Sequence, residues 1–153
     1  MKVFDYINII YGCIAVALTA IFGDFWFLFV AFLVLNMVDY ITGVLKARHT
    51  NKVNSNAGAK GIIKKVGYWI VIAISFFISA TFVQLGQLIG IELGFVVLFG
   101  WFTLATFIIN EIRSVLENLI ELDVDVPEFL IKGLEVAADA IEKKSGEKDE
   151  SNR

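Results

Sequence analysis

The feature that most constrains this chain is a series of apolar stretches, each close to the length that a helix needs to cross a bilayer, about 20 residues. Residues 25–45, 67–91 and 94–112 are the clearest of them, and residues 67–91 contain no charged side chain. Hydrophobic residues make up 58% of the chain, whereas about 45–50% is typical of soluble domains. A soluble domain of 153 residues cannot bury such an excess, so we expect the chain to lie in lipid.

A fourth apolar stretch, near the N-terminus, is shorter. Residues 7–22 form a helix of only about 24 Å, and the stretch reaches the required length only when it is extended back to residue 3. A cleaved signal peptide is an alternative reading. However, Asp5 lies close to Lys2 and the next apolar stretch follows almost at once, so we expect the segment to be retained.

These stretches predict an all-α, polytopic membrane protein with four transmembrane helices, or three if the first stretch stays on the membrane surface. The membrane bundle is expected to cover residues 1–112. Residues 113–143 are predicted to form cytoplasmic amphipathic helices, and residues 144–153 a disordered charged tail. The membrane helices are expected at about residues 3–22, 25–45, 67–91 and 94–112.

The segment between the second and third stretches, residues 46–66, carries basic residues and no acidic ones. Short segments rich in Lys and Arg stay in the cytoplasm, so we predict a cytoplasmic loop here, and four spans then place both termini in the cytoplasm. The same residues predict contact with anionic lipid headgroups. They are Lys46, Arg48, Lys52, Lys60, Lys64 and Lys65.

The chain after residue 112 is acidic, with eleven acidic and six basic residues. Asp125, Pro127 and Glu128 indicate the start of a helix. Because the topology places this tail on the same side as the basic segment, we expect the two to attract each other. A single apolar stripe leaves two roles open, packing under the protein's own bundle or contact with a partner.

Polar residues inside the spanning stretches are costly in lipid, so each needs a partner or a wet surface. Asp39 either pairs near the cytoplasmic boundary or faces a subunit interface or a water-filled lumen. For Glu111 we expect the membrane boundary. Small residues at helical spacing favour close helix approach, although Gly90 and Gly94 suit a turn equally well. Together these residues form the predicted oligomer or pore face: Asn36, Asp39, Gly43, Ser75, Ser79, Gln84, Gly86, Gln87, Gly90, Thr103, Thr106 and Asn110.

The sequence contains no motif for nucleophilic catalysis, nucleotide binding or metal binding. Cys13 and His49 each stand alone, so we expect Cys13 to be a small buried hydrophobe and His49 a solvated loop residue. We therefore expect no enzyme activity, no cofactor and no metal site. The basic segment lies at the membrane without interleaved aromatic residues, which favours lipid headgroups over nucleic acid.

Residues 39–47, with the sequence Asp-Tyr-Ile-Thr-Gly-Val-Leu-Lys-Ala, end a membrane stretch and precede a polar segment with the basic pair Lys64 and Lys65. Together with the run EIRSVLENL at 111–119, this pattern resembles the toxin-secretion/phage-lysis holin family of Gram-positive phages and clostridial loci. The resemblance covers roughly residues 25–135 and carries no catalytic residues. It implies a protein that accumulates in the bacterial cytoplasmic membrane and then forms homo-oligomeric lesions, through which an endolysin or a large toxin is released.

Two other functions stay open from the sequence. One is a small ion or solute channel with a fixed pore lined by the polar faces. The other is a membrane adaptor that docks a cytoplasmic partner through its acidic tail. Release of a folded enzyme separates the first from a lesion, because a narrow pore passes ions only.

Overall fold

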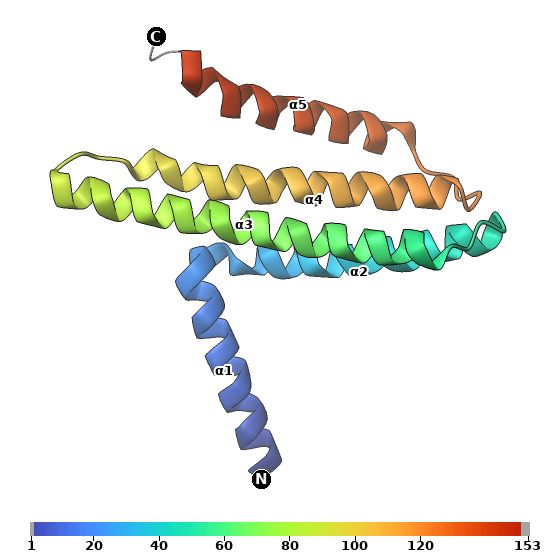
Figure 1. The fold of residues 1–153 in the computed structure, drawn as a ribbon, viewed down its shortest axis with the longest axis horizontal. Coiled ribbons are helices and arrows are strands. Elements are labelled where there is room, and N and C mark those ends of the chain that lie inside the picture. Colours follow the sequence, from blue (N-terminus) through green and yellow to red (C-terminus); the bar gives the residue numbers. More distant parts are fainter. Residues whose placement is uncertain (1, 151–153) are drawn as a thin grey trace.

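The computed structural model describes the backbone of residues 2–150 and the side chains of residues 4–145 (Figure 1). Every regular element within this range is helical, as the sequence predicts. The elements are α1 (Lys2–Phe22), η1 (Gly23–Phe25), α2 (Trp26–His49), α3 (Ser55–Ile89), η2 (Gly94–Val96), α4 (Val97–Ile120) and α5 (Glu128–Glu150).

Helices α2, α3 and α4 lie side by side as a long bundle, and α4 packs against both of the others (Figure 1). Helix α1 leaves this bundle at a steep angle, and α5 folds back along α4. The buried apolar core gathers near the junction of α1 with the bundle, where the rings of Phe22 and Phe76 meet edge to face with centroids 4.9 Å apart. The core residues are Phe22, Phe32, Ile72, Phe76 and Leu104.

A polar N-cap begins the long helix α3, and a glycine ends it. The side chain of Asn54 accepts hydrogen bonds from the backbone N–H groups of Asn56 and Ala57, which satisfies free donors at the start of the helix. At the other end Gly90 adopts a φ of +74°, a conformation that favours glycine. The N–H of Ile91 then donates to the carbonyl of Gly86 at 2.8 Å. Gly90 therefore ends α3 and begins the turn toward α4, and the carbonyl of Gly86, inside α3, accepts a hydrogen bond from that turn.

Within the described residues, three helical stretches are long and apolar enough to cross a membrane: Phe4–His49, Ser55–Ile89 and Gly94–Ile120. The expected count of four spans is not confirmed, because α1, η1 and α2 follow one another without a break in helical structure. This first stretch nevertheless contains two helices of different direction (Figure 1).

The outside of the described helices is apolar. Phe77 on α3 is 73% exposed, and Leu88 on the same helix is 83% exposed. Cys13, which we expected to be buried, is exposed on α1. Because water disfavours such a surface, the bundle suits a lipid environment.

Two boundaries differ from the sequence prediction. Most of the expected loop 46–66 is helical, since α2 continues to His49 and α3 begins at Ser55, which leaves a turn over residues 50–54. The Asn54 cap and the absence of proline explain the early start of α3. Helix α5 also extends to Glu150, into the segment that we expected to be disordered, through a run rich in Lys and Glu, which are good helix formers. Disorder of this tail stays a prediction. The last residues, 151–153, lie outside the described part.

Candidate functional site

A buried ion cluster joins the three bundle helices near their polar ends. Lys65 on α3 lies between Asp39 on α2 and Glu111 on α4. Its Nζ is 2.8 Å from Asp39 Oδ2 and also pairs with Glu111 Oε2. The Lys65 side chain is only 16% exposed and that of Glu111 only 4%. One cation therefore connects carboxylates from two neighbouring helices away from solvent.

Asn118 on α4 completes this cluster on the side of α2. Its Nδ2 donates to Asp39 Oδ1 at 3.0 Å and to the hydroxyl oxygen of Thr42 at 3.2 Å. Gly43 lies beside the amide, since a Cβ on this glycine would be 3.7 Å from Asn118 Nδ2. Asp39 thus has a cation and an amide donor, and a buried carboxylate requires such partners.

A second polar contact lies closer to the middle of the bundle. Asn36 is buried, and its Nδ2 donates to the carbonyl of Phe32 at 2.7 Å. The indole N–H of Trp69 donates to Asn36 Oδ1 at 3.4 Å. The side-chain amide of Asn36 therefore finds its hydrogen-bond partners within the same chain.

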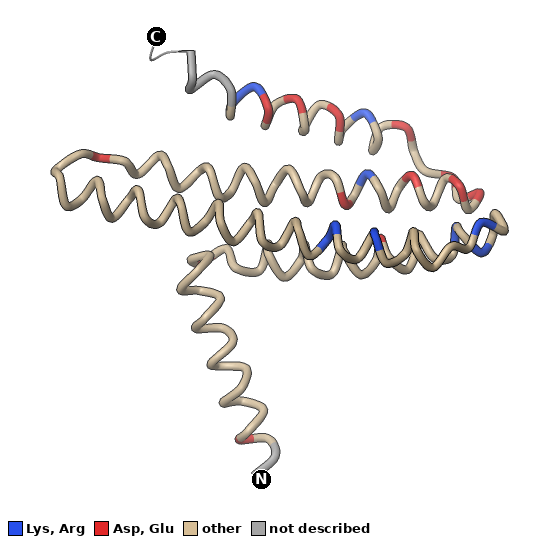
Figure 2. The backbone as a smooth tube through the Cα atoms, in the orientation of Figure 1, with Lys and Arg blue, Asp and Glu red and all other residues tan. Residues whose placement is uncertain are grey.

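Charged residues continue from the cluster to the adjacent end of the bundle. Lys46 pairs with Glu121 at 3.2 Å, and His49 Nε2 lies 3.2 Å from Asp123 Oδ2. Figure 2 shows Lys and Arg of α2 and α3 beside the acidic end of α4 and the start of α5. The basic segment and the acidic tail, which we expected to attract each other, therefore meet at these pairs.

Several residues of the predicted oligomer or pore face lie inside the protomer. Ser75, Ser79 and Gly86 are buried, and Ser79 Oγ accepts a hydrogen bond from the N–H of Gly100 on α4 at 3.2 Å. Ser79 therefore connects α3 to α4 of the same chain, whereas Gly86 leaves room for the turn residues Ile91 and Leu93. With Asn36 and Asp39 the two buried serines form an internal polar seam.

The other members of that predicted face stay at or near the surface. Thr103 is half-buried and Thr106 exposed, and their hydroxyls donate to the carbonyls of Phe99 and Phe102. The remaining exposed members are Gln84, Gln87, Gly90 and Asn110. Their role in assembly stays a prediction.

Sequence reasoning missed the burial of Glu111 and the part played by Asn118. The expected position of Glu111 at the membrane boundary stays a prediction, but within the bundle Glu111 is 3% exposed and bound to Lys65. The available signal was helical spacing, because Glu111 and Asn118 are seven residues apart and so share one face of α4. That spacing does not indicate which helix packs against this face.

Comparison with known proteins places these features in a family. A family model described as the bacteriophage holin family matches residues 16–139, most of the chain. This chain belongs to the bacteriophage holin family. The resemblance found in the sequence is thereby confirmed, and the three apolar helices agree with a protein of the cytoplasmic membrane. The family is one of non-catalytic membrane proteins, which agrees with the expectation that the chain is not an enzyme.

Relatives of this holin-family protein come from Gram-positive bacteria and a phage. A protein named a probable holin, from Bacillus phage phi105, is 28% identical over 119 residues, which cover 78% of this chain and 80% of the relative. An uncharacterized protein of Clostridium perfringens is 36% identical over 118 residues, covering 76% of this chain and 78% of the relative. Another, from Halalkalibacterium halodurans, is 28% identical over 123 residues, covering 80% and 87%. No solved structure matches.

The ion cluster predicts a large stability loss when its cation is removed. In a Lys65→Met variant Asp39 and Glu111 stay buried without their cation, so we expect the free energy of unfolding in detergent to fall by about 3 kcal/mol or more. Denaturant titration followed by circular dichroism measures this loss. Adding Asp39→Asn and Glu111→Gln to the variant removes the uncompensated charges and should recover most of the stability.

The matched control is Lys46→Met, because the Lys46 pair with Glu121 is much more exposed. Its loss should stay below about 1 kcal/mol. Equal losses in the two lysine variants would show that the buried cluster has no special role.

Proposed function

We propose that this protein is a holin that oligomerises in the bacterial cytoplasmic membrane and opens lesions there, through which a phage endolysin or a large toxin leaves the cell, without catalysis. The proposal rests mainly on one observation. The polar groups inside the bundle are hydrogen-bonded or ion-paired with each other, and the exterior of the bundle is apolar. Within the described residues, no buried side-chain nitrogen or oxygen lacks a hydrogen-bond partner. Membership of the holin family and the phage relative support the same function.

This division explains how single copies accumulate without damage. The interior polar groups of Asn36, Asp39 and Lys65 need no water or second subunit, because their hydrogen bonds and charges are matched within the chain. The apolar exterior is stable against lipid tails. A single copy therefore offers no polar path across the membrane.

Assembly requires outward-facing polar groups that can form hydrogen bonds with a second copy of the protein. The side-chain amides of Gln84, Gln87 and Asn110 are exposed and make no hydrogen bond with another described residue. In lipid such amides gain from a neighbouring helix or from a wet lumen. Each gain is small, so association depends on the surface concentration of the protein, and mass action gives an abrupt onset.

The topology we propose has four spans with both termini in the cytoplasm. Helix α1 has 21 residues and α2 has 24, so each is long enough to cross alone. Their different directions support two crossings rather than one (Figure 1). Gly23, with a φ of +64°, provides the conformational freedom for a reversal between them. The basic residues around the turn at 50–54 favour the cytoplasm for that end of the bundle.

Helix α5 belongs on the cytoplasmic side in this proposal. It lies along α4 (Figure 1), and Asp139 and Glu142 border the same groove as Phe99 and Phe102. Charged side chains at the depth of these phenylalanines are costly in hydrocarbon. We therefore expect α5 to move away from α4 in the membrane, about the non-helical residues 121–127.

Release of a folded enzyme tests the function. The protein is expressed from an inducible promoter in bacteria that contain a cytoplasmic reporter enzyme, and ion leakage and enzyme activity in the medium are followed together. We expect both to begin abruptly at one expression level, because a lesion passes folded protein. Co-expressed endolysin should then lyse the cells at that time.

Ion leakage without enzyme release would contradict the proposal and indicate the narrow channel instead. Membranes that stay intact at high expression would contradict both the holin and the channel, and would favour a membrane adaptor. Immunoblotting of the membrane fraction provides the expression control.

Cysteine labelling tests the topology. In intact cells an impermeant maleimide should leave Cys13 unlabelled, because α1 then lies in hydrocarbon. Asn51→Cys and Ala138→Cys, each in a Cys13→Ser background, should label only after the cells are permeabilised. Labelling of Cys13 from outside would place α1 on the outer surface, and protection of Ala138→Cys in permeabilised cells would show that α5 stays on α4.

A further inference from the structure

We propose that the polar end of α3 and α4 is a binding site for one amine-bearing, zwitterionic phospholipid of the cytoplasmic leaflet. The phosphate lies between Lys64 and Arg113, the headgroup amine faces Glu117, and an acyl chain follows the apolar face of α3 and α4. The inference rests on the proposed membrane location and on the proposed movement of α5 away from α4, and it does not require lesion formation.

The headgroup site is a polar cavity of about 440 Å³ between α3 and α4. Its charged lining is balanced, with three basic and three acidic side chains. Lys65 is already bound to Asp39 and Glu111. The other charged groups are Lys64, Arg113 and Glu117.

These three remaining groups have no ionic partner among the described residues. Arg113 and Glu117 are one turn apart on α4, a spacing at which opposite charges often pair, yet they form no ion pair. Lys64 Nζ lies over the ring of Tyr68, 5.7 Å from its centroid, and makes no salt bridge. Two cations and one carboxylate of the cavity lining thus form no salt bridge with another described residue.

The balance of charges selects the class of lipid. A phosphate is bound best by Arg and Lys together, because Arg supplies two parallel donors and Lys a point charge. A purely anionic headgroup would satisfy the two cations and leave Glu117 unpaired. A headgroup that also carries a primary amine satisfies all three, since its ammonium donates to a carboxylate.

An apolar groove of about 1010 Å³ continues from this cavity along α3 and α4. Asn110 and Arg113 border both spaces, so the groove ends next to the headgroup site. It runs from Arg113 to Phe95, about 27 Å along the helix. The hydrocarbon of one leaflet is about 15 Å thick, so an acyl chain fits within this length.

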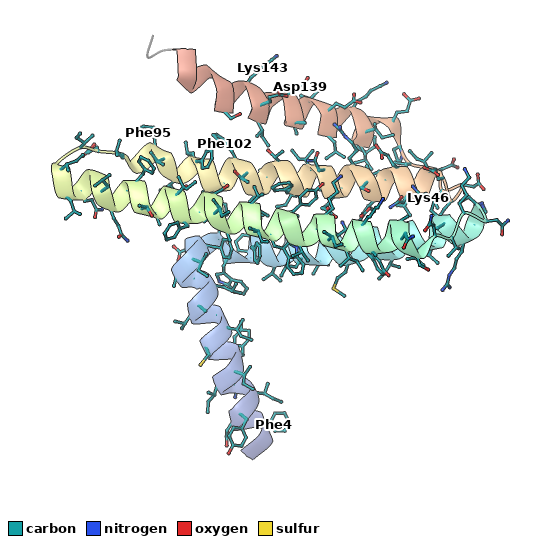
Figure 3. The ribbon with its side chains drawn as sticks, in the orientation of Figure 1. Phe4, Lys46, Phe95, Phe102, Asp139 and Lys143 are labelled. Atoms are coloured by element: carbon teal, nitrogen blue, oxygen red, sulfur yellow. The ribbon has the colours of Figure 1, made fainter. Side chains whose placement is uncertain are left out.

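Phenylalanines form one wall of the groove, and Phe95 in η2 and Phe102 in α4 lie on the side that faces α5 (Figure 3). Helix α5 supplies the opposite wall through Ala138 and Ile141. When α5 moves to the cytoplasm, as proposed above, this face of α4 loses its cover. An acyl chain then takes that place, and its headgroup lies at the polar end of the groove.

Lipid retention by the full-length protein tests the proposal. The protein is incubated in mild detergent with equal amounts of phosphatidylethanolamine, phosphatidylglycerol and phosphatidylcholine of the same chain length, and the bound lipids are counted by native mass spectrometry. We expect one phosphatidylethanolamine, retained about tenfold better than the other two, since one charge-assisted hydrogen bond corresponds to about that ratio.

Three exposed residues provide the variants, so that loss of folding does not obscure the result. Arg113→Gln should abolish the retention of all three lipids, whereas Glu117→Gln should remove only the preference for phosphatidylethanolamine. Lys60→Gln, on α3 but outside the cavity, should behave as the wild type. Unchanged thermal unfolding midpoints check the fold of each variant.

Equal retention of the three lipids by the wild type would overturn the proposal and indicate ordinary lipid contact. A preference for phosphatidylglycerol would overturn it in favour of an anionic lipid. Retention that is unaffected by Arg113→Gln would place the lipid elsewhere. None of these readings depends on enzyme release, so failure of the lipid site is distinguishable from failure of the holin function.

Discussion

The contact of Lys65 with Asp39 and Glu111 is the interaction on which the rest of the bundle depends. Each of the helices α2, α3 and α4 contributes one charge, and none of these charges is stable against lipid alone. Because the three side chains must meet at one level, the cluster fixes the register of the helices relative to one another. The apolar packing of Phe32, Ile72 and Leu104 then follows along the same helices.

The same contact explains why a single copy can stay in the membrane without forming a water-filled path. Matching the charges inside the protomer removes the main reason for water to enter the bundle. The outward polar groups that remain are few, and the amides of Gln84 and Gln87 are weaker attractors than an unpaired charge. A protein built in this way stays dispersed in lipid until its surface concentration rises, which is the behaviour that the holin proposal requires.

Much of the fold could be predicted because lipid imposes simple rules on a sequence. Apolar length identified the stretches that form α2, α3 and α4, and Gly90 marked the end of α3. The helical ends beyond the apolar stretches were not predictable from hydropathy, since residues 46–49 and 55–66 are polar and depend on the Asn54 cap and on partner charges. The burial of Glu111 could not be predicted either, because only the tertiary fold brings Lys65 next to it.

The most direct test of the account is the proximity of α2 and α4 at their polar ends in a membrane. Lys46→Cys and Glu121→Cys, in a Cys13→Ser background, replace side chains whose charged atoms are 3.2 Å apart. After treatment of isolated membranes with a short bifunctional maleimide, the chain is cleaved at a protease site placed in the turn at 50–54. The account predicts that the two halves stay linked, and that Lys65→Met weakens the link. Halves that separate completely in the otherwise unaltered protein would contradict it.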